Sequence, residues 1–136
     1  MKAIGIMPGK VPEILEIDEN SVSEFLKNYV GGRIECVYPF EDPVALVCNE
    51  YGKILKLQPN RLMRDDVDRP WDIICGPFVI LGDGVVYKEA YEDAEIEEGS
   101  DFVSLSEELI QKYCSLYYAP QWFGRGLLWW LDDKYR

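Results

Sequence analysis

Residues 21–32, SVSEFLKNYVGG, decide the fold because they predict one well-defined helix early in a chain otherwise rich in strand patterns. Ser21 and Glu24 have the spacing of a capping box, in which two side chains satisfy free N–H groups at a helix start. One face then carries, at the helical period, the apolar residues Val22, Phe25, Leu26, Tyr29 and Val30. Gly31 and Gly32 follow, and one of them is expected at the left-handed position that ends a helix.

Patterns typical of strands lie on both sides of this helix. They predict strands at residues 3–7, 11–18, 33–40, 44–49, 53–58, 72–81 and 85–91. The run at 72–81, DIICGPFVIL, is the most hydrophobic, so we expect a central strand there, with a bulge or bend at Gly76-Pro77. A second capping box, Ser104 with Glu107, predicts another helix that ends before Pro120. Its apolar face should contain Leu105, Leu109, Ile110, Tyr113, Leu116 and Tyr117.

Strands that cluster in hairpins around an early helix predict an α+β fold, with a single mixed or mostly antiparallel sheet packed with two helices. A grasp-like sheet that holds the first helix is one topology that fits. One hairpin should join 44–49 to 53–58 through a tight turn with Gly52 at positive φ. Pro59 should end the returning strand, and the charged residues 61–71 should form an excursion.

The apolar positions of these elements predict a core. Its expected members are Val22, Phe25, Leu26, Ile34, Val47, Leu57, Ile74, Val79 and Leu81. Phe25 should contribute about 3–5 kcal/mol if the helix face is fully buried.

Composition excludes several classes of function. The 136 residues contain 25 acids, 14 bases and no histidine, for a formal charge of −11. This charge would repel a nucleic-acid backbone, and the lack of histidine excludes triads, general bases and metal ligands that use it. The four cysteines, Cys36, Cys48, Cys75 and Cys114, have no C-x-x-C spacing, so we expect buried reduced thiols and no zinc. We find no signal peptide or membrane span in the sequence and expect a cytoplasmic protein that binds no membrane.

Two stretches are candidate surfaces. Residues 89–101, EAYEDAEIEEGSD, contain seven acids and no base, which indicates either a solvated loop or an imitation of DNA charge. The tail carries a candidate aromatic interface of Trp122, Phe123, Trp129 and Trp130. Tryptophan is enriched at interface hot spots, but a tail that folds back as a lid on the sheet is an equal alternative.

A candidate polar site brackets the predicted hairpin. Its members are Asn49, Glu50, Lys53, Asn60 and Arg61. In one interpretation Lys53 and Arg61 hold an anion, because the guanidinium fork suits phosphate or carboxylate. In the other, the amides bond turn backbone and the charges pair with acids such as Glu35.

Three blocks together resemble a known family: residues 30–35 (VGGRIE), 47–53 (VCNEYGK) with 57–61 (LQPNR), and 72–82 (DIICGPFVILG). This combination resembles the domain of unknown function 3846 family, small proteins of bacteria, phages and mobile elements. The resemblance implies an α+β domain over residues 1–118, with an aromatic-rich tail or short helix at 119–136 beyond it. It implies no established activity, although relatives often lie near antirestriction genes.

These observations favour a non-enzymatic protein-interaction domain from a phage or mobile element, with no catalytic residues, metal or cofactor. Its partner is an unknown protein, with no direct binding of nucleic acid, and the tail is a candidate surface for homo-oligomers. Two alternatives stay open: a DNA-mimic inhibitor of the antirestriction type, and a sensor of small anions or nucleotides.

Overall fold

The computed structural model describes residues 1–65, 67–84 and 102–124. In chain order the elements are β1 (Lys2–Ile6), β2 (Glu13–Glu16), α1 (Val22–Val30), β3 (Ile34–Val37), β4 (Val44–Asn49), β5 (Pro59–Arg64), β6 (Pro70–Cys75), β7 (Phe78–Asp83), β8 (Phe102–Val103) and α3 (Glu107–Leu116). Six strands form one sheet in the order β2-β1-β7-β4-β3, with β8 paired to β7, and β5 and β6 form a separate two-stranded sheet. Every strand pairing in these described ranges is antiparallel.

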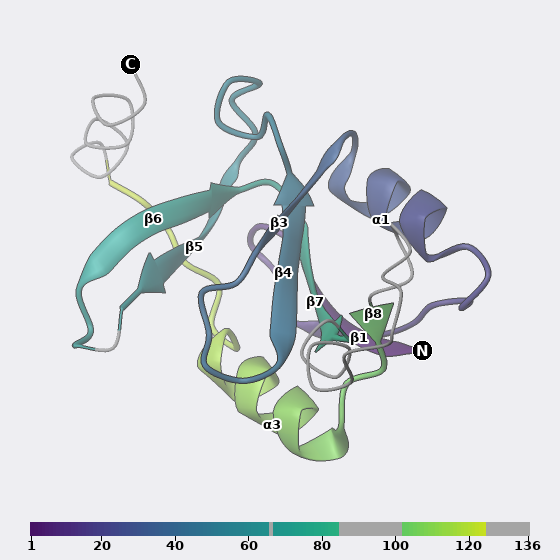
Figure 1. The fold of residues 1–136 in the computed structure, drawn as a ribbon. Helices are drawn as coiled ribbons and strands as arrows, with labels where there is room; N and C mark the ends of the chain where they lie inside the picture. Colours follow the sequence, from purple (N-terminus) through teal and green to yellow (C-terminus); the bar gives the residue numbers. More distant parts are fainter. Residues whose placement is uncertain (66, 85–101, 125–136) are drawn as a thin grey trace.

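The two helices cover opposite faces of the large sheet (Figure 1). The layer beneath α1 contains Ala3, Ile17, Val22, Leu26, Val47, Val79 and Leu81. The layer on the α3 side contains Ile4, Ile6, Val44, Leu46, Cys48, Met63, Ile74, Phe78, Ile80, Leu105, Ile110, Tyr113 and Tyr117. Both layers draw on β7, which is buried along its whole length, as expected of a strand covered on two faces. The predicted α+β class is confirmed, with two helices in the part of the chain that the structure describes.

The helix starts differ in detail from their predicted capping boxes. Ser21 is the N-cap residue of α1, but its side chain makes no capping bond, because its backbone (φ −139°, ψ 33°) lacks the usual extended N-cap geometry. The second helix is capped by Ser106, whose side chain accepts the Leu109 N–H, so the predicted box at Ser104 is wrong. Ser104 instead accepts the backbone N–H of Lys2. The C-terminal prediction for the first helix is confirmed, since Gly31 adopts φ 81°.

The predicted hairpin between 44–49 and 53–58 is wrong. Residues 51–56 form consecutive turns with local bonds such as Leu55 N–H to the Tyr51 carbonyl. Gly52 has no positive φ; it is needed because a Cβ there would lie 2.5 Å from the Cys75 carbonyl oxygen. Pro59 begins β5 rather than ending a strand, a position where its missing N–H is tolerated. The expected excursion at 61–71 mostly belongs to the strands β5 and β6.

The single strand predicted at 72–81 is also wrong, because the chain changes sheets within it. Gly76 adopts φ 90°, and with Pro77 it forms the corner between β6 and β7. A Cβ at Gly76 would lie 2.7 Å from the side chain of Leu57, so this corner has no room for one. The predicted bend therefore moves the chain from the small sheet into the centre of the large one.

Most of the predicted core is buried. Phe25, Ile34 and Leu57 are half-buried instead, because they lie at the rims of their clusters. Leu116, predicted on the apolar face of the second helix, is 59% exposed, because it lies in the last turn before the Tyr117 cap.

All four cysteines are free thiols, with Cys48 and Cys75 buried and Cys36 and Cys114 half-buried. No helix in the described ranges has the length and apolar composition to cross a membrane. The strand predicted at 85–91 and the acidic stretch at 89–101 lie outside the described residues.

Candidate functional site

The five residues of the predicted polar site divide into two groups. Asn49, Glu50 and Lys53 line a cleft of about 230 Å³ between β3–β4 and β6. Asn60 and Arg61 do not line this cleft; they lie on β5 and bond to β1, its following turn and the end of α3. The separation follows from the chain entering β5 at Pro59 instead of returning beside β4.

Arg61 is fully buried, and every one of its N–H donors is bonded to oxygen. Nε donates to the Tyr117 carbonyl (3.2 Å), and Nη2 donates to the carbonyls of Tyr117 (3.0 Å) and Lys10 (2.6 Å). Nη1 donates to the Asn60 carbonyl (3.3 Å) and to its Oδ1 (2.8 Å). No N–H of this guanidinium is left for an anion.

The charge of Arg61 is stabilised by dipoles rather than by a carboxylate. Tyr117 is the C-cap residue of α3, so its carbonyl lies at the negative end of the helix dipole. Burial lowers the pKa of Arg61 from its usual value. The same burial raises the pKa of the Tyr117 phenol, so this phenol stays neutral next to the guanidinium.

Asn60 completes the same network. Its Nδ2 donates to the carbonyls of Ile6 and Gly76, each at 2.9 Å. It therefore links the end of β1 to the corner between the two sheets, while its Oδ1 accepts from Arg61. Both residues hold the small sheet against the large one.

Asn49 and Glu50 also have structural partners. The Asn49 side chain donates to the Val30 carbonyl (3.2 Å) and accepts the Tyr51 N–H (2.8 Å), which joins the end of α1 to the turn after β4. Glu50 forms a 2.9 Å ion pair with Arg33, whose side chain is 74% exposed.

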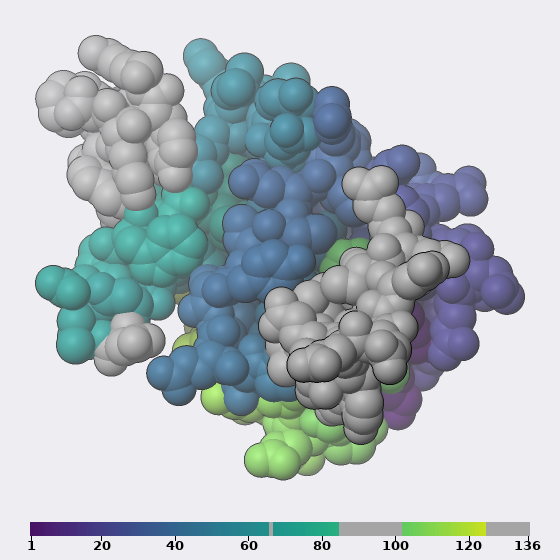
Figure 2. Space-filling model, in the orientation of Figure 1, coloured from purple at the N-terminus to yellow at the C-terminus, as the bar shows by residue number. Residues whose placement is uncertain are grey.

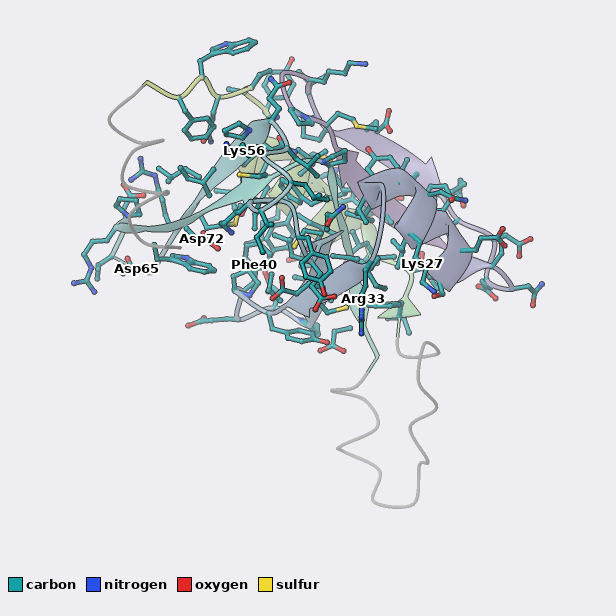
Figure 3. All side chains as sticks on the ribbon, turned by 90° about the horizontal axis from the view of Figure 1, so that it is seen from above. Lys27, Arg33, Phe40, Lys56, Asp65 and Asp72 are labelled. Atoms are coloured by element: carbon teal, nitrogen blue, oxygen red, sulfur yellow. The ribbon has the colours of Figure 1, made fainter. Side chains whose placement is uncertain are left out.

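Lys53 pairs across the cleft with Asp72 at 3.2 Å, and their side chains are 25% and 11% exposed. In the view from above, Asp72 lies between Asp65, at the outer end of the small sheet, and Phe40 (Figure 3). Sequence reasoning did not select Asp72, although a lone acid that opens an otherwise apolar run was a usable signal.

The thiols beside this pair are not activated nucleophiles. Burial raises the pKa of Cys48 to about 12, and it also raises the pKa of Cys75. A thiol with a raised pKa holds little of the reactive thiolate at neutral pH. The cleft therefore offers charged and polar contacts rather than covalent chemistry.

A second cleft, of about 470 Å³, lies between α3, the β3–β4 loop and β5. One edge is held by Asp42, which accepts from Lys112 Nζ and from the Tyr113 hydroxyl, both at 2.6 Å. These two bonds lower the pKa of Asp42, and burial together with the Asp42 carboxylate raises the pKa of Tyr113.

The candidate aromatic interface is described only in part. Phe123 packs on a small cluster around Ile73 and Cys75 on β6. Trp122, its neighbour, is 78% exposed, and the edge of its ring lies beside Gly9. Trp129 and Trp130 are outside the described residues.

The model of one protein family, described as Domain of unknown function (DUF3846), matches residues 1–118. No curated protein and no solved structure matches the chain.

Proposed function

We propose that this chain, which belongs to the family Domain of unknown function (DUF3846), is a non-enzymatic protein-interaction domain. The observation that carries the proposal is the 78% exposed side chain of Trp122 in a segment that is otherwise anchored. On one side the Gln121 side chain accepts the Leu62 N–H at 2.8 Å, and on the other Phe123 packs on β6. An indole held in water by anchored neighbours is typical of an interface hot spot.

The polar groups support a binding role over catalysis. The buried polar side chains Asn49, Asn60 and Arg61 bond to main-chain groups that join separate elements. Lys53 is paired with Asp72, and the pKa values of the buried thiols are raised. The candidate polar residues therefore stabilise the fold through these contacts, and this favours recognition of a partner at the surface over catalysis.

Neither alternative has a specific observation in its favour. A sensor of anions would need free donors on Arg61, and all of them are bonded to oxygen. A DNA mimic would use the acids of 89–101, which lie outside the described residues. The family resemblance supports an origin in a phage or mobile element, and four free thiols support a cytoplasmic location.

The test is capture of partners from the native host with wild-type protein, Trp122→Ala and the matched control Tyr118→Ala, whose native side chain is 64% exposed. A hot-spot residue contributes about 2 kcal/mol or more, so Trp122→Ala should weaken the captured complex roughly 30-fold. Tyr118→Ala should retain it. Equal binding by all three proteins would refute the role of Trp122.

The tail is also the proposed surface for self-association. Deleting residues 121–136 should leave a folded protein that sediments as a smaller species at concentrations where the full chain associates. Two results would contradict an interface in the tail: unfolding of the truncated chain, or association of the truncated chain into the same oligomer as the full chain.

A further inference from the structure

The strand β3 lies at one end of the large sheet. Within the described ranges it pairs with β4 alone. An edge strand presents unpaired N–H and C=O groups, to which an extended segment of another chain can add as a further strand. Figure 2 shows the β3–β4 region in blue at the front of the molecule, beside the teal surface of the small sheet.

The pairing with β4 determines which groups of β3 point outward. The Glu50 N–H donates to the Arg33 carbonyl at 2.8 Å, so Arg33 and Glu50 form a hydrogen-bonded pair. Bonded and non-bonded pairs alternate along an antiparallel ladder. In the observed register Ile34 is opposite Asn49 and Cys36 is opposite Val47, so both are non-bonded positions. The N–H and C=O groups of Ile34 and Cys36 therefore face away from β4.

The side chains of β3 alternate between two environments. Ile34 and Cys36 pack toward the core layer that lies under α1. Glu35 and Val37 line the cleft of about 230 Å³ between the sheets. Because side chains alternate in any strand, every second residue of an added strand would lie over this cleft.

The charges around the cleft favour a basic occupant. Its lining contains the carboxylates of Glu35, Glu50 and Asp72 against the single ammonium of Lys53. Asp72 pairs with Lys53 and Glu50 pairs with Arg33, whereas the ion pairs of the described residues do not include Glu35. The formal charge of −11 on the whole chain would also attract a basic segment and speed its encounter.

We propose that the β3 edge binds an extended basic segment of a partner protein as an added strand, with lysine or arginine side chains over the cleft beside Glu35. This inference rests on the proposed function and names a partner class for it. The β3 edge is a different surface from the one around Trp122. An experiment can therefore refute this inference without refuting the role of Trp122, and the reverse.

The probe is a labelled octapeptide of alternating lysine and valine, titrated into the full chain by fluorescence anisotropy. Two control peptides separate charge from strand addition: alternating glutamate and valine, and alternating lysine and proline, which keeps the charge but lacks the N–H of every second residue. The lysine–valine peptide should bind at least about tenfold more tightly than either control, a difference of roughly 1.4 kcal/mol. Amide exchange at Ile34 and Cys36 should slow when it binds.

Two protein variants locate the charge contact. Glu35→Lys should weaken binding of the lysine–valine peptide at least about tenfold. Glu19→Lys, a change of the same charge at an exposed site between β2 and α1, should weaken it less than about twofold, the level of a screened long-range effect.

Three results would overturn the proposal. Equal binding of the lysine–proline peptide would show attraction by charge without strand addition. Equal effects of the two lysine variants would place the contact elsewhere. Slow exchange at Ile34 and Cys36 in the free protein would show that the edge is already covered, by a second copy if sedimentation shows a dimer and by the same chain if it shows a monomer. The Trp122 capture experiment would be unaffected by any of these outcomes.

Discussion

Replacement of Arg61 by alanine should be among the most destabilising changes in this protein. The side chain is fully buried, and its removal leaves the carbonyls of Tyr117 and Lys10 and the Oδ1 of Asn60 without that donor. Hydrogen bonds from a charged donor contribute about 1.5–3 kcal/mol each, but burying the guanidinium costs several kcal/mol in return. We therefore expect a net loss of about 3–5 kcal/mol, the usual effect of removing one partner from a buried charged network.

The conservative variant refines this magnitude. Arg61→Lys keeps the charge but offers three donors in place of five and has no planar fork. Loss of two of the five hydrogen bonds predicts about two-fifths of the effect of Arg61→Ala, a destabilisation of roughly 1–2 kcal/mol. The control is Arg64→Ala on the same strand, whose side chain is 49% exposed and pairs with Asp68, and which should cost less than about 1 kcal/mol.

Urea denaturation followed by tryptophan fluorescence measures all three variants. The order of unfolding free energies should be wild type and Arg64→Ala, then Arg61→Lys, then Arg61→Ala, with similar m-values. If Arg61→Ala loses less than about 1 kcal/mol, the range of ordinary surface changes, the guanidinium does not hold the sheets together.

Three further predictions concern the rest of the fold. In the folded protein the pKa of Asp42 lies below its ordinary 3.8. The contribution of Asp42 to folding stability is therefore complete above pH 3.8 and is lost as the pH falls below that value. Between neutral and acid pH, Asp42→Asn should lose less unfolding free energy than wild type. Mass spectrometry after brief alkylation should find the half-buried Cys114 modified before Cys48, whose pKa is raised to about 12, and the reverse order would contradict the burial. Leu26→Ala should cost about 2–5 kcal/mol in urea denaturation and more than Phe25→Ala, because Leu26 is fully buried and Phe25 only half-buried; equal losses would contradict this difference.

Local signals were sufficient to predict part of this fold. The helix at 22–30 is specified by its own apolar period and by the glycine that follows it, both of which are properties of neighbouring residues. The strands β2, β3 and β4 also lie within their predicted ranges, and β1 begins and ends one residue before its predicted range, because short apolar runs between turn residues mark these strands.

Long-range contacts account for the errors. The turn at Gly52 is set by its close approach to the Cys75 carbonyl, from a distant part of the chain. The corner at Gly76 sends β6 and β7 into different sheets, and nothing in an apolar run states which sheet a strand joins. Without those two contacts, the sequence does not show that the next strand is β5, which begins at Pro59. The incorrect hairpin between 44–49 and 53–58 follows from that omission.

The same limit applies to the candidate polar site. The sequence shows that Arg61 can offer five N–H donors. Whether these donors bond to an anion or to main-chain carbonyls depends on which acceptors the fold places beside them. Here the acceptors come from Asn60, from the turn after β1 and from the end of α3, separated from Arg61 by as many as 56 positions. No pattern of neighbouring residues in the sequence predicts these long-range contacts.

The network around Arg61 also gives a physical reason for where the family match ends. The match covers residues 1–118 and so includes Tyr117, whose carbonyl accepts two N–H groups of Arg61. Among the described residues the small sheet shares no strand pairing with the large one. These bonds, those of Asn60 and the packing of Met63 and Ile74 hold the two sheets together. A chain that stopped before Tyr117 would lose the acceptor for a buried cation, whereas one that stops just after it keeps the whole network. The anchored segment around Trp122 lies beyond this requirement, so we expect a chain without it to keep all the hydrogen bonds of Arg61.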